Sequence, residues 1–215
     1  MRLGFFFPKA RARVATSFFK LGYAPVAEYP VTVIPPILGH DVKDLVPAPE
    51  PGHVTVYVSA ASHIGQSLDE LLDIFAKFPD HRFTCFVDAP AAAVPVNVTV
   101  MGSDRPAFID SLRRSAAVIS TAGHNLITEA LYLHVPMFLL PFAHYEQQLN
   151  ARIVSDEGLG CAAPRLSEAN LAAFFDTLDA YRRRGLETTE MYDRFDGDTV
   201  FLDMVEALLN EGNHA

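Results

Sequence analysis

One stretch of the sequence combines a glycine, an amide and a carboxylate at a spacing suited to nucleotide binding. Gly123 and Asn125 follow the apolar run 116–120, and Glu129 lies one turn further along a predicted helix. The free N–H groups and positive dipole end of a helix that begins near Asn125 favour an anion such as a diphosphate. Glu129 can accept hydrogen bonds from both hydroxyls of the attached ribose. The simpler alternative is that Asn125 only caps the helix and that Glu129 is a solvated helix residue.

A second polar pair stands at the next strand-to-helix junction. Glu146 and Gln147 follow the apolar run 136–141, which ends at Pro141. A carboxylate next to a carboxamide offers several hydrogen-bonding atoms for sugar hydroxyls. A polar helix start is common, but two such junctions in close succession are much less common by chance. The pair therefore extends the predicted site from a nucleotide towards a sugar.

Regular alternation of strands and helices from residue 53 onward predicts the elements that position these residues. An α/β fold follows, with a Rossmann-like parallel sheet and helices on both of its faces. Ligands of such sheets bind at the carboxyl ends of the strands. The predicted strands are 54–59, 81–87, 97–101, 116–120 and 136–141, and the predicted helices are 66–78, a short one around 108–112, 125–133, 144–157, 167–183 and 199–209.

Residues 1–50 differ from the rest of the chain. They are rich in proline, and the runs 13–19 and 31–34 are the candidate strands. Prolines and a glycine within 47–52 predict a linker. We therefore expect an arm or linker over 1–50, the remnant of another domain, and one ligand-binding domain over 53–215.

Composition excludes several classes of function. The formal net charge is -9, and the one dense basic run, 182–184, lies late in a predicted helix, which argues against a nucleic-acid-binding face. No apolar run is long enough to span a bilayer or to act as a secretory signal. Two isolated cysteines, Cys85 and Cys161, suggest buried thiols in a reducing cytoplasm. Dinucleotide, Walker, Asp-x-Asp and Cys/His metal motifs are missing from the sequence, so we expect no cofactor and no metal.

The two junctions together resemble the donor-binding signature of GT-B glycosyltransferases. The similarity includes residues 121–125 and 129–131, Val135-Pro136, Pro141, Glu146-Gln147 and Asn150-Ala151. It is greatest to the UDP-glucuronosyl/UDP-glucosyltransferases and the MurG-type N-acetylglucosaminyltransferases. The run 33–38, with its two prolines, also resembles the segment that precedes the second domain in bacterial members. The resemblance is strong over 116–160 and extends from residue 53 to the end.

The resemblance implies a role for each candidate residue. The phosphate-facing loop would include Ser59, Ser62 and His63, and the base would lie beside the loop 101–105, with Gly102, and beside Phe108. The diphosphate would bind at Thr121, Gly123, His124 and Asn125, the ribose at Glu129, and the donor sugar at Glu146 and Gln147. The sequence departs from the plant pattern at Thr121, where histidine is usual, at Leu126, where serine is usual, and at His134, where glycine is usual.

The resemblance also implies an activity and a partner. We expect transfer of a hexose from a UDP-sugar, without a metal, in which the helix N-terminus stabilises the diphosphate leaving group. GT-B enzymes have a second, acceptor-binding domain, for which this chain has no room. An acceptor-binding domain, a separate subunit or a homo-oligomer would then complete the site, and peripheral membrane association could come through that partner. The alternatives are a nucleotide-sugar 2-epimerase of the same architecture and a non-catalytic nucleotide-sugar-binding module.

Overall fold

The computed structural model describes residues 10–19, 31–58, 65–88, 93–191 and 195–212 and divides the chain into two compact units. The larger unit is Gly39–Asp193, and the smaller unit combines Met1–Leu38 with Arg194–Ala215. The sequence suggested a boundary near 47–52 and placed the last helix in the large domain. In the structure residues 39–52 instead group with the large unit, and the last helix groups with the N-terminal segment.

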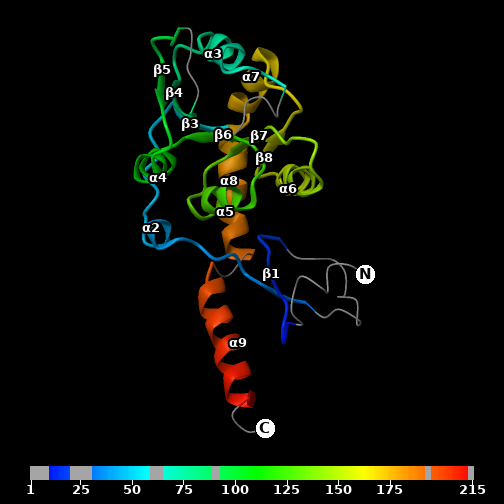
Figure 1. The fold of residues 1–215 in the computed structure, drawn as a ribbon. Coiled ribbons are helices and arrows are strands. Elements are labelled where there is room, and N and C mark those ends of the chain that lie inside the picture. The colour runs from blue at the N-terminus through cyan, green and yellow to red at the C-terminus, as the bar shows by residue number, and fades with distance from the viewer. Residues whose placement is uncertain (1–9, 20–30, 59–64, 89–92, 192–194, 213–215) are drawn as a thin grey trace. The chain divides into compact units, whose positions relative to one another are not determined.

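The larger unit is built on a six-stranded sheet in which every neighbouring pair of strands is parallel. This arrangement, flanked by helices, confirms the predicted fold class (Figure 1). The strand order is β5-β4-β3-β6-β7-β8. The strands are β3 (His53–Tyr57), β4 (Arg82–Phe86), β5 (Val98–Met101), β6 (Ala117–Ser120), β7 (Met137–Leu139) and β8 (Gly160–Ala162). The sequence did not predict β8.

The strand order contains a switch point between β3 and β6. From β3 the chain moves outward through β4 to β5, then returns across the sheet to β6 and moves outward the other way. The strands that follow β3 and β6 in the chain, β4 and β7, therefore lie on opposite sides of this pair. Open parallel sheets bind ligands in the crevice that forms at this point.

The helices of the larger unit agree with the predicted positions, with two differences. A short helix in the proline-rich region was not predicted, and the predicted helix 167–183 is two helices separated at Thr177. The helices are α2 (His40–Lys43), α3 (Leu68–Phe75), α4 (Arg105–Arg113), α5 (His124–Tyr132), α6 (Tyr145–Asp156), α7 (Glu168–Asp176) and α8 (Leu178–Met191).

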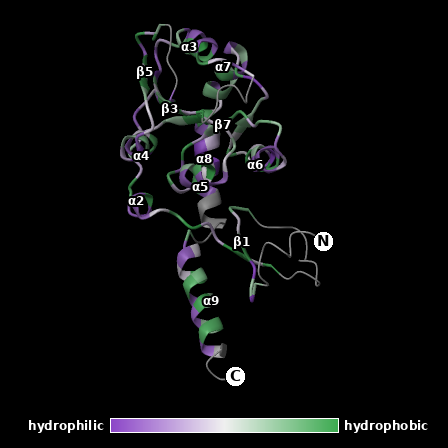
Figure 2. Cartoon of the chain, in the orientation of Figure 1, coloured by the Kyte–Doolittle hydropathy of each residue, from purple (hydrophilic) through white to green (hydrophobic). Residues whose placement is uncertain are grey.

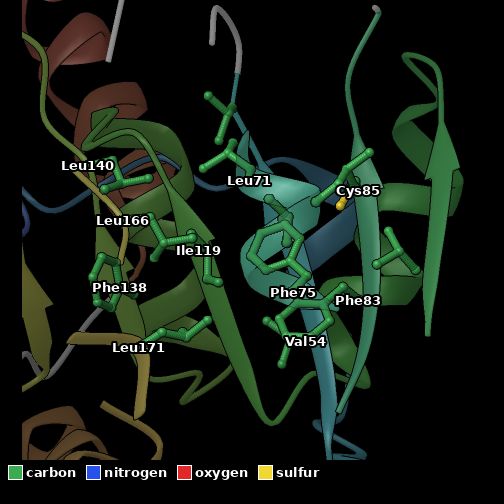
Figure 3. Close-up of a cluster of buried hydrophobic side chains, with 14 of the residues drawn as sticks. Val54, Leu71, Phe75, Phe83, Cys85, Ile119, Phe138, Leu140, Leu166 and Leu171 are labelled. Atoms are coloured by element: carbon green, nitrogen blue, oxygen red, sulfur yellow. The ribbon is translucent and has the colours of Figure 1, made fainter. Parts of the chain in front are cut away.

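The main hydrophobic core lies where α3 and α7 cover one face of the sheet (Figure 3). Phe75 of α3 is fully buried and stacks on Phe83 of β4, with ring centroids 4.3 Å apart. Phe138 of β7 packs edge-on against Phe174 of α7 at 5.5 Å. Burial of these large rings stabilises the sheet and so fixes the positions of the strand ends.

A buried polar cluster lies near the amino end of β3. Ser111 of α4 lies 3.0 Å from the His53 ring, measured from Oγ to Nε2, and 2.6 Å from the Thr55 hydroxyl. The Thr55 hydroxyl also lies 2.6 Å from that of Ser115, which donates to the Ser111 carbonyl. These four side chains therefore bond to one another and connect α4 to the sheet.

The end of α5 has an unusual backbone conformation. His134 follows the last turn and has a φ of 55°, in the left-handed region that glycine adopts most easily. This is the position where the resembled family usually has glycine. A left-handed residue after the last turn is a common way for a helix to end. The departure at His134 therefore keeps the conformation of the helix end but adds strain.

The smaller unit contains two short parallel strands and the last helix. Strand β1 (Val14–Thr16) pairs with β2 (Thr32–Ile34), and both lie where strands were predicted. Helix α9 (Gly197–Gly212) begins against the segment after β2, where the Gly197 N–H donates to the Pro36 carbonyl at 3.2 Å. Figure 2 shows apolar residues along α9, and the exposed ones include Phe201, Leu202 and Leu209.

The two cysteines are both free thiols. Cys85 is buried, as predicted, whereas Cys161 is only partly buried. Burial raises the pKa of Cys85 to about 12 and that of Cys161 to about 11, so both are protonated at neutral pH. Among the helices of the described residues, none has the length and apolar character needed to cross a bilayer.

Candidate functional site

The site begins at the junction between β6 and α5, on the switch-point side of the sheet. Thr121 is buried, and its carbonyl accepts a hydrogen bond from the Gly123 N–H at 2.9 Å. Gly123 is the N-cap of α5, and no side chain caps this helix end. The helix therefore starts at His124, and the alternative that Asn125 is its N-cap is wrong. An uncapped first turn presents its N–H groups to any anion in the crevice.

Gly123 is not needed for the turn itself. Its φ of -72° and ψ of 136° are open to any residue, so the turn does not require a glycine. A Cβ built on Gly123 would meet no atom of the described residues within 4 Å, its two chain neighbours aside. As far as these residues are concerned, the space in front of this backbone is open. A glycine here leaves room for a group from outside the chain to approach the backbone closely.

Asn150 of α6 holds this junction in place. Its side chain is buried, and Nδ2 donates to the Ala122 carbonyl at 3.0 Å. Ser120, at the end of β6, is fully buried, and its hydroxyl has no hydrogen-bond partner among the described residues. Asn150 was part of the family resemblance found in the sequence, but no role was assigned to it. Its role in the structure is to fix the loop that precedes α5.

Glu129 is buried and paired, so the alternative that it is a solvated helix residue is wrong. Its side chain is only 10% exposed, and Oε1 accepts a hydrogen bond from the Arg105 guanidinium at 2.7 Å. A buried carboxylate is costly to desolvate, and a cation beside it offsets that cost. The structure therefore keeps an anionic acceptor one turn inside the helix that begins at the switch point.

Arg105, the first residue of α4, bridges two carboxylates. Its Nε donates to Asp41 Oδ2 at 2.7 Å and its second nitrogen donates to Oδ1 at 3.2 Å, while the same nitrogen reaches Glu129. Burial lowers the pKa of Arg105, but the hydrogen bonds to Asp41 and Glu129 outweigh it and raise the pKa above its ordinary value. The Arg105 hydrogen bond lowers the pKa of Asp41. Arg105 and Asp41 are therefore both charged at neutral pH.

An aromatic cluster lies beside this ion pair. Phe108 of α4 packs against Tyr57 at the end of β3, with ring centroids 5.3 Å apart, and edge-on against Phe86 at the end of β4, at 5.4 Å. The Arg105 guanidinium lies 5.9 Å from the Phe108 ring centroid. Phe108 is buried, but Tyr57 is 37% exposed. Tyr57 is thus the ring of this trio with an accessible surface, and the sequence analysis did not single it out.

Gly102 lies on the loop after β5, which Asp88 fixes. Asp88 Oδ1 accepts from the Ser103 N–H at 2.9 Å, and its other oxygen accepts from the Ser103 hydroxyl. That hydroxyl contact lowers the pKa of Asp88. A Cβ on Gly102 would come within 3.2 Å of Asp88 Oδ1, which is tighter than an ordinary contact. Glycine at this position therefore allows the loop to pack against Asp88.

The starts of α5 and α6 lie within electrostatic reach of each other. Burial lowers the pKa of His124, while Asn125 and the negative charge of Glu146 act in the opposite direction. Gln147 is tied to its own loop, because Oε1 accepts from the Phe142 N–H at 3.4 Å. The amide nitrogen of Gln147, Nε2, donates no hydrogen bond to any described residue. The two predicted junctions are therefore neighbours in space.

The structure brings most of the predicted residues to one edge of the sheet. Those on the loop after β3, namely Ser59, Ser62 and His63, lie outside the described residues. The sequence analysis assigned no role to Asp41, Tyr57 or Asn150 and named Arg105 only as the end of a loop. A polar residue at a strand end was a usable signal for Tyr57. Nothing in the sequence indicated the pairing of Arg105 with Glu129.

Comparison with solved structures places this architecture among glycosyltransferases. The glycotransferase of kitacinnamycin aligns with a TM-score of 0.65 at 23% identity, over 82% of this chain and 49% of that one. The calicheamicin glycosyltransferase CalG4 aligns with a TM-score of 0.63 at 22% identity, over 84% of this chain and 47% of that one. The glycosyltransferase VinC in complex with dTDP aligns with a TM-score of 0.57 at 16% identity, over 78% of this chain and 45% of that one. At these identities the likeness shows a shared fold, and the chain spans about half the length of these structures.

Sequence comparison gives the family. A curated relative, an uncharacterized glycosyltransferase of Methanosarcina acetivorans, is 38% identical over 68 residues, which are 31% of this chain and 18% of the relative. The family model described as glycosyl transferase family 1 matches residues 4–179. That match covers most of the chain, including the whole six-stranded sheet and both junctions of the candidate site. The chain belongs to glycosyl transferase family 1.

Proposed function

We propose that this chain binds the nucleoside-diphosphate-sugar donor of a glycosyltransferase reaction at the carboxyl edge of its sheet. The observation that carries the proposal is Glu129, a buried, ion-paired carboxylate one turn inside the helix whose uncapped start lies at the switch point. A carboxylate there suits ribose hydroxyls, and the helix start suits the diphosphate. The open space in front of Gly123 gives the phosphates room.

The chemistry of the proposed reaction needs stabilisation of a leaving group. When the bond between the sugar and the diphosphate breaks, negative charge grows on the diphosphate. Backbone N–H groups and the dipole at the start of α5 would stabilise that charge without rearranging, because Asn150 fixes the preceding loop. Glu146 and Gln147, at the start of α6, are the proposed contacts to the donor sugar.

The proposed donor is a hexose linked to UDP, as the sequence resemblance implies. VinC was solved with dTDP, which makes dTDP donors the obvious comparison. The acceptor-binding part is proposed to lie in another domain or subunit, because the related structures are about twice as long as the aligned region. Assays of the whole reaction therefore require that partner.

The direct test is calorimetric titration of the chain with UDP. We expect saturable binding, weakened in the Glu129→Gln variant by about 1–3 kcal/mol for the loss of a charge-assisted contact. Glu157→Gln is the matched control, because Glu157 is also paired with an arginine, Arg184, but lies at the far end of α6. This control should bind UDP like the unmodified chain. No heat with UDP or dTDP at millimolar concentration would refute the proposal.

A second titration separates the sugar contacts from the nucleotide contacts. Glu146 is exposed at the start of α6, and its replacement by alanine should disturb the fold little. Glu146→Ala and Gln147→Ala should weaken the binding of UDP-glucose while leaving UDP binding nearly unchanged. Equal losses for both ligands would mean that these residues do not contact the sugar.

A further inference from the structure

The short helix α2 is anchored to the two helices that form the candidate site. Val42 is fully buried, and the Lys43 carbonyl accepts a hydrogen bond from the hydroxyl of Tyr132 in α5. From α4, Arg105 reaches Asp41. A helix of four residues has little stability of its own, so these contacts fix its position. They thereby also fix the place of the Asp41 carboxylate.

A continuous chain of hydrogen bonds leads from Asp41 to Glu129. Asp41 accepts from Arg105 Nε at 2.7 Å and from a second guanidinium nitrogen at 3.2 Å, which is a two-point contact with the planar fork of arginine. That second nitrogen also donates to Glu129 Oε1 at 2.7 Å. Because the guanidinium is rigid and planar, the contact with Asp41 sets the direction from which Arg105 approaches Glu129.

Gly39, the N-cap of α2, leaves room for this arrangement. A Cβ on Gly39 would collide with Asp41 Oδ1 and lie 3.7 Å from a nitrogen of the Arg105 guanidinium. The φ of -64° and ψ of 147° at Gly39 suit any residue. A glycine is therefore needed here for space and not for its backbone conformation.

The outer part of the chain of contacts adds little to the stability of the fold. The side chains of Arg105 and Asp41 are 47% and 45% exposed, whereas that of Glu129 is 10% exposed. Ion pairs as exposed as that of Arg105 with Asp41 contribute little to folding. The same contact nevertheless fixes the orientation of the group that faces the buried carboxylate.

We propose that Asp41 and Arg105 are positioning residues for the nucleotide, that they act through Glu129, and that this role requires Gly39. The inference rests on the proposed function, since it assumes that Glu129 binds the ribose. Asp41 sets the plane of the guanidinium, and the guanidinium holds the Glu129 carboxylate and balances its charge. The carboxylate then meets the ribose in one orientation, without a loss of side-chain freedom on binding.

The other end of α4 provides a matched control. Arg114 also joins two carboxylates, since it donates to Glu50 at 3.0 Å and to Asp110 at 3.0 Å. Glu50, like Asp41, comes from the segment before β3. Glu50→Ala therefore removes the same kind of contact, with the same change of charge, at the end of α4 opposite Arg105.

The first experiment is calorimetric titration of the two variants with UDP. Asp41→Ala should weaken UDP binding about fivefold, part of the loss expected when a charge-assisted hydrogen bond is removed outright. Glu50→Ala should stay within about twofold of the unmodified chain. Removal of a negative charge by itself favours an anionic ligand, so a weaker affinity identifies lost positioning. Unchanged or tighter binding by Asp41→Ala would overturn the inference.

A second experiment displaces the Asp41 carboxylate without changing any charge. Gly39→Ala should weaken UDP binding about as much as Asp41→Ala does, and the double variant should bind no more weakly than Asp41→Ala alone. Gly185→Ala is the control, because a Cβ on Gly185 in α8 meets no atom of the described residues within 4 Å, its two chain neighbours aside. Losses that add in the double variant would mean that Gly39 does not act through Asp41.

A third experiment tests whether the effect passes through Glu129. In a Glu129→Gln chain, Asp41→Ala should change the UDP dissociation constant by less than about twofold. A fivefold loss that persists there would overturn the inference, because general damage to the fold weakens binding in both backgrounds. Arg105→Lys keeps the charge without the fork, so its affinity for UDP should lie between those of the unmodified chain and Arg105→Met.

The inference and the proposed function fail in different ways. If Asp41→Ala does not fold, as a thermal melt would reveal, Asp41→Asn keeps the shape of the side chain and replaces it, with Glu50→Gln as its control. If UDP binds equally well to the unmodified chain and to the folded Asp41 and Gly39 variants, only the inference fails. If UDP does not bind to the unmodified chain, the proposed function itself fails.

Discussion

The amino end of β3 and the junction between β6 and α5 both hold buried polar groups, but only at the second do some of these groups lack a partner among the described residues. At the amino end, His53, Thr55, Ser111 and Ser115 bond to one another, and Ser111 is 3% exposed. At the carboxyl edge, the Ser120 hydroxyl and Glu129 Oε2 have no partner among the described residues. A complete buried network stabilises a fold, whereas an acceptor such as Glu129 Oε2 keeps the capacity to bond a ligand.

This difference also explains why the amino-end cluster is not a catalytic site. A histidine nitrogen 3.0 Å from a serine hydroxyl is the contact that activates a nucleophile in many hydrolases. Here Ser111 is closed off by the sheet and α4, and its hydroxyl is also held by Thr55. Burial lowers the pKa of His53, in keeping with a neutral ring inside a structural network.

The largest effect is expected from a substitution that breaks the hydrogen-bond network at the amino end of β3. Thr55→Val removes the hydroxyl that contacts both Ser111 and Ser115, and it should cost about 1–3 kcal/mol of unfolding free energy because buried groups lose their partner. The affinity for UDP should stay the same. Urea unfolding and calorimetry measure the two quantities separately.

A different result for Thr55→Val would contradict the purely structural role of the amino-end network. If UDP affinity falls while the unfolding free energy is unaffected, the amino end takes part in binding. Thr55→Ser is the control, since it keeps the hydroxyl and removes only a methyl group.

An intermediate effect is expected from Asn150, whose hydrogen bond contributes both to stability and to the proposed binding site. Asn150→Ala removes the hydrogen bond to the Ala122 carbonyl and should destabilise the chain by about 1–2 kcal/mol. It should also weaken UDP binding, because the loop before α5 loses its support. Asn170→Ala, which loses a capping contact at α7, should lower the stability without affecting UDP binding. A normal UDP affinity for Asn150→Ala would mean that the loop is positioned by other contacts.

The sequence predicted the edge of the sheet better than the contacts made there. Strand and helix periodicity located five strands of the sheet, whereas their order, and with it the switch point, is known only from the structure. β8 was missed because Gly160, Cys161 and Ala162 are three residues without a β-branched side chain. The break between α7 and α8 was missed because Thr177 carries no strong stop signal.

The pairings within the site could not be derived from spacing. Arg105 and Glu129 lie on different helices, and Asp41 comes from a helix of four residues in a proline-rich segment. Which charges meet depends on how the helices pack, and a single sequence does not encode that in any local pattern. That the turn at Gly123 does not require a glycine could not be predicted for a related reason, since the φ of this residue is known only from the structure.

A smaller effect on stability, without an effect on binding, is expected at the end of α5 that lies away from the site. His134, at the end opposite the site, has a φ of 55°, so His134→Gly should be more stable than His134→Ala by about 1 kcal/mol. Comparing these two variants isolates the backbone conformation, because both lack the imidazole. Their UDP affinities should be equal. Thermal unfolding gives the difference, and a more stable alanine variant would contradict the prediction.

The smallest effect concerns pH. His81, just before β4, stacks on Phe175 with ring centroids 3.8 Å apart, and burial lowers its pKa from the ordinary 6.5. The unfolded chain therefore takes up a proton first as the pH falls below about 6.5, and folding stability is lost in that direction. His81→Phe keeps the stacking and removes the titration. Its melting temperature should match that of the unmodified chain at pH 7.5 and fall less by pH 5.5; equal falls would contradict this.

The division of the chain has a consequence for its synthesis. The larger unit is one continuous segment, Gly39–Asp193, whereas the smaller unit needs both the strands near residue 32 and the helix that begins at Gly197. On the ribosome the α/β unit can emerge and fold while β2 still lacks α9, because domains fold as their residues become available. The Gly197 N–H reaches the Pro36 carbonyl only at the end of this process. Translation that stops before α9 would thus release the α/β unit with an unfinished first segment.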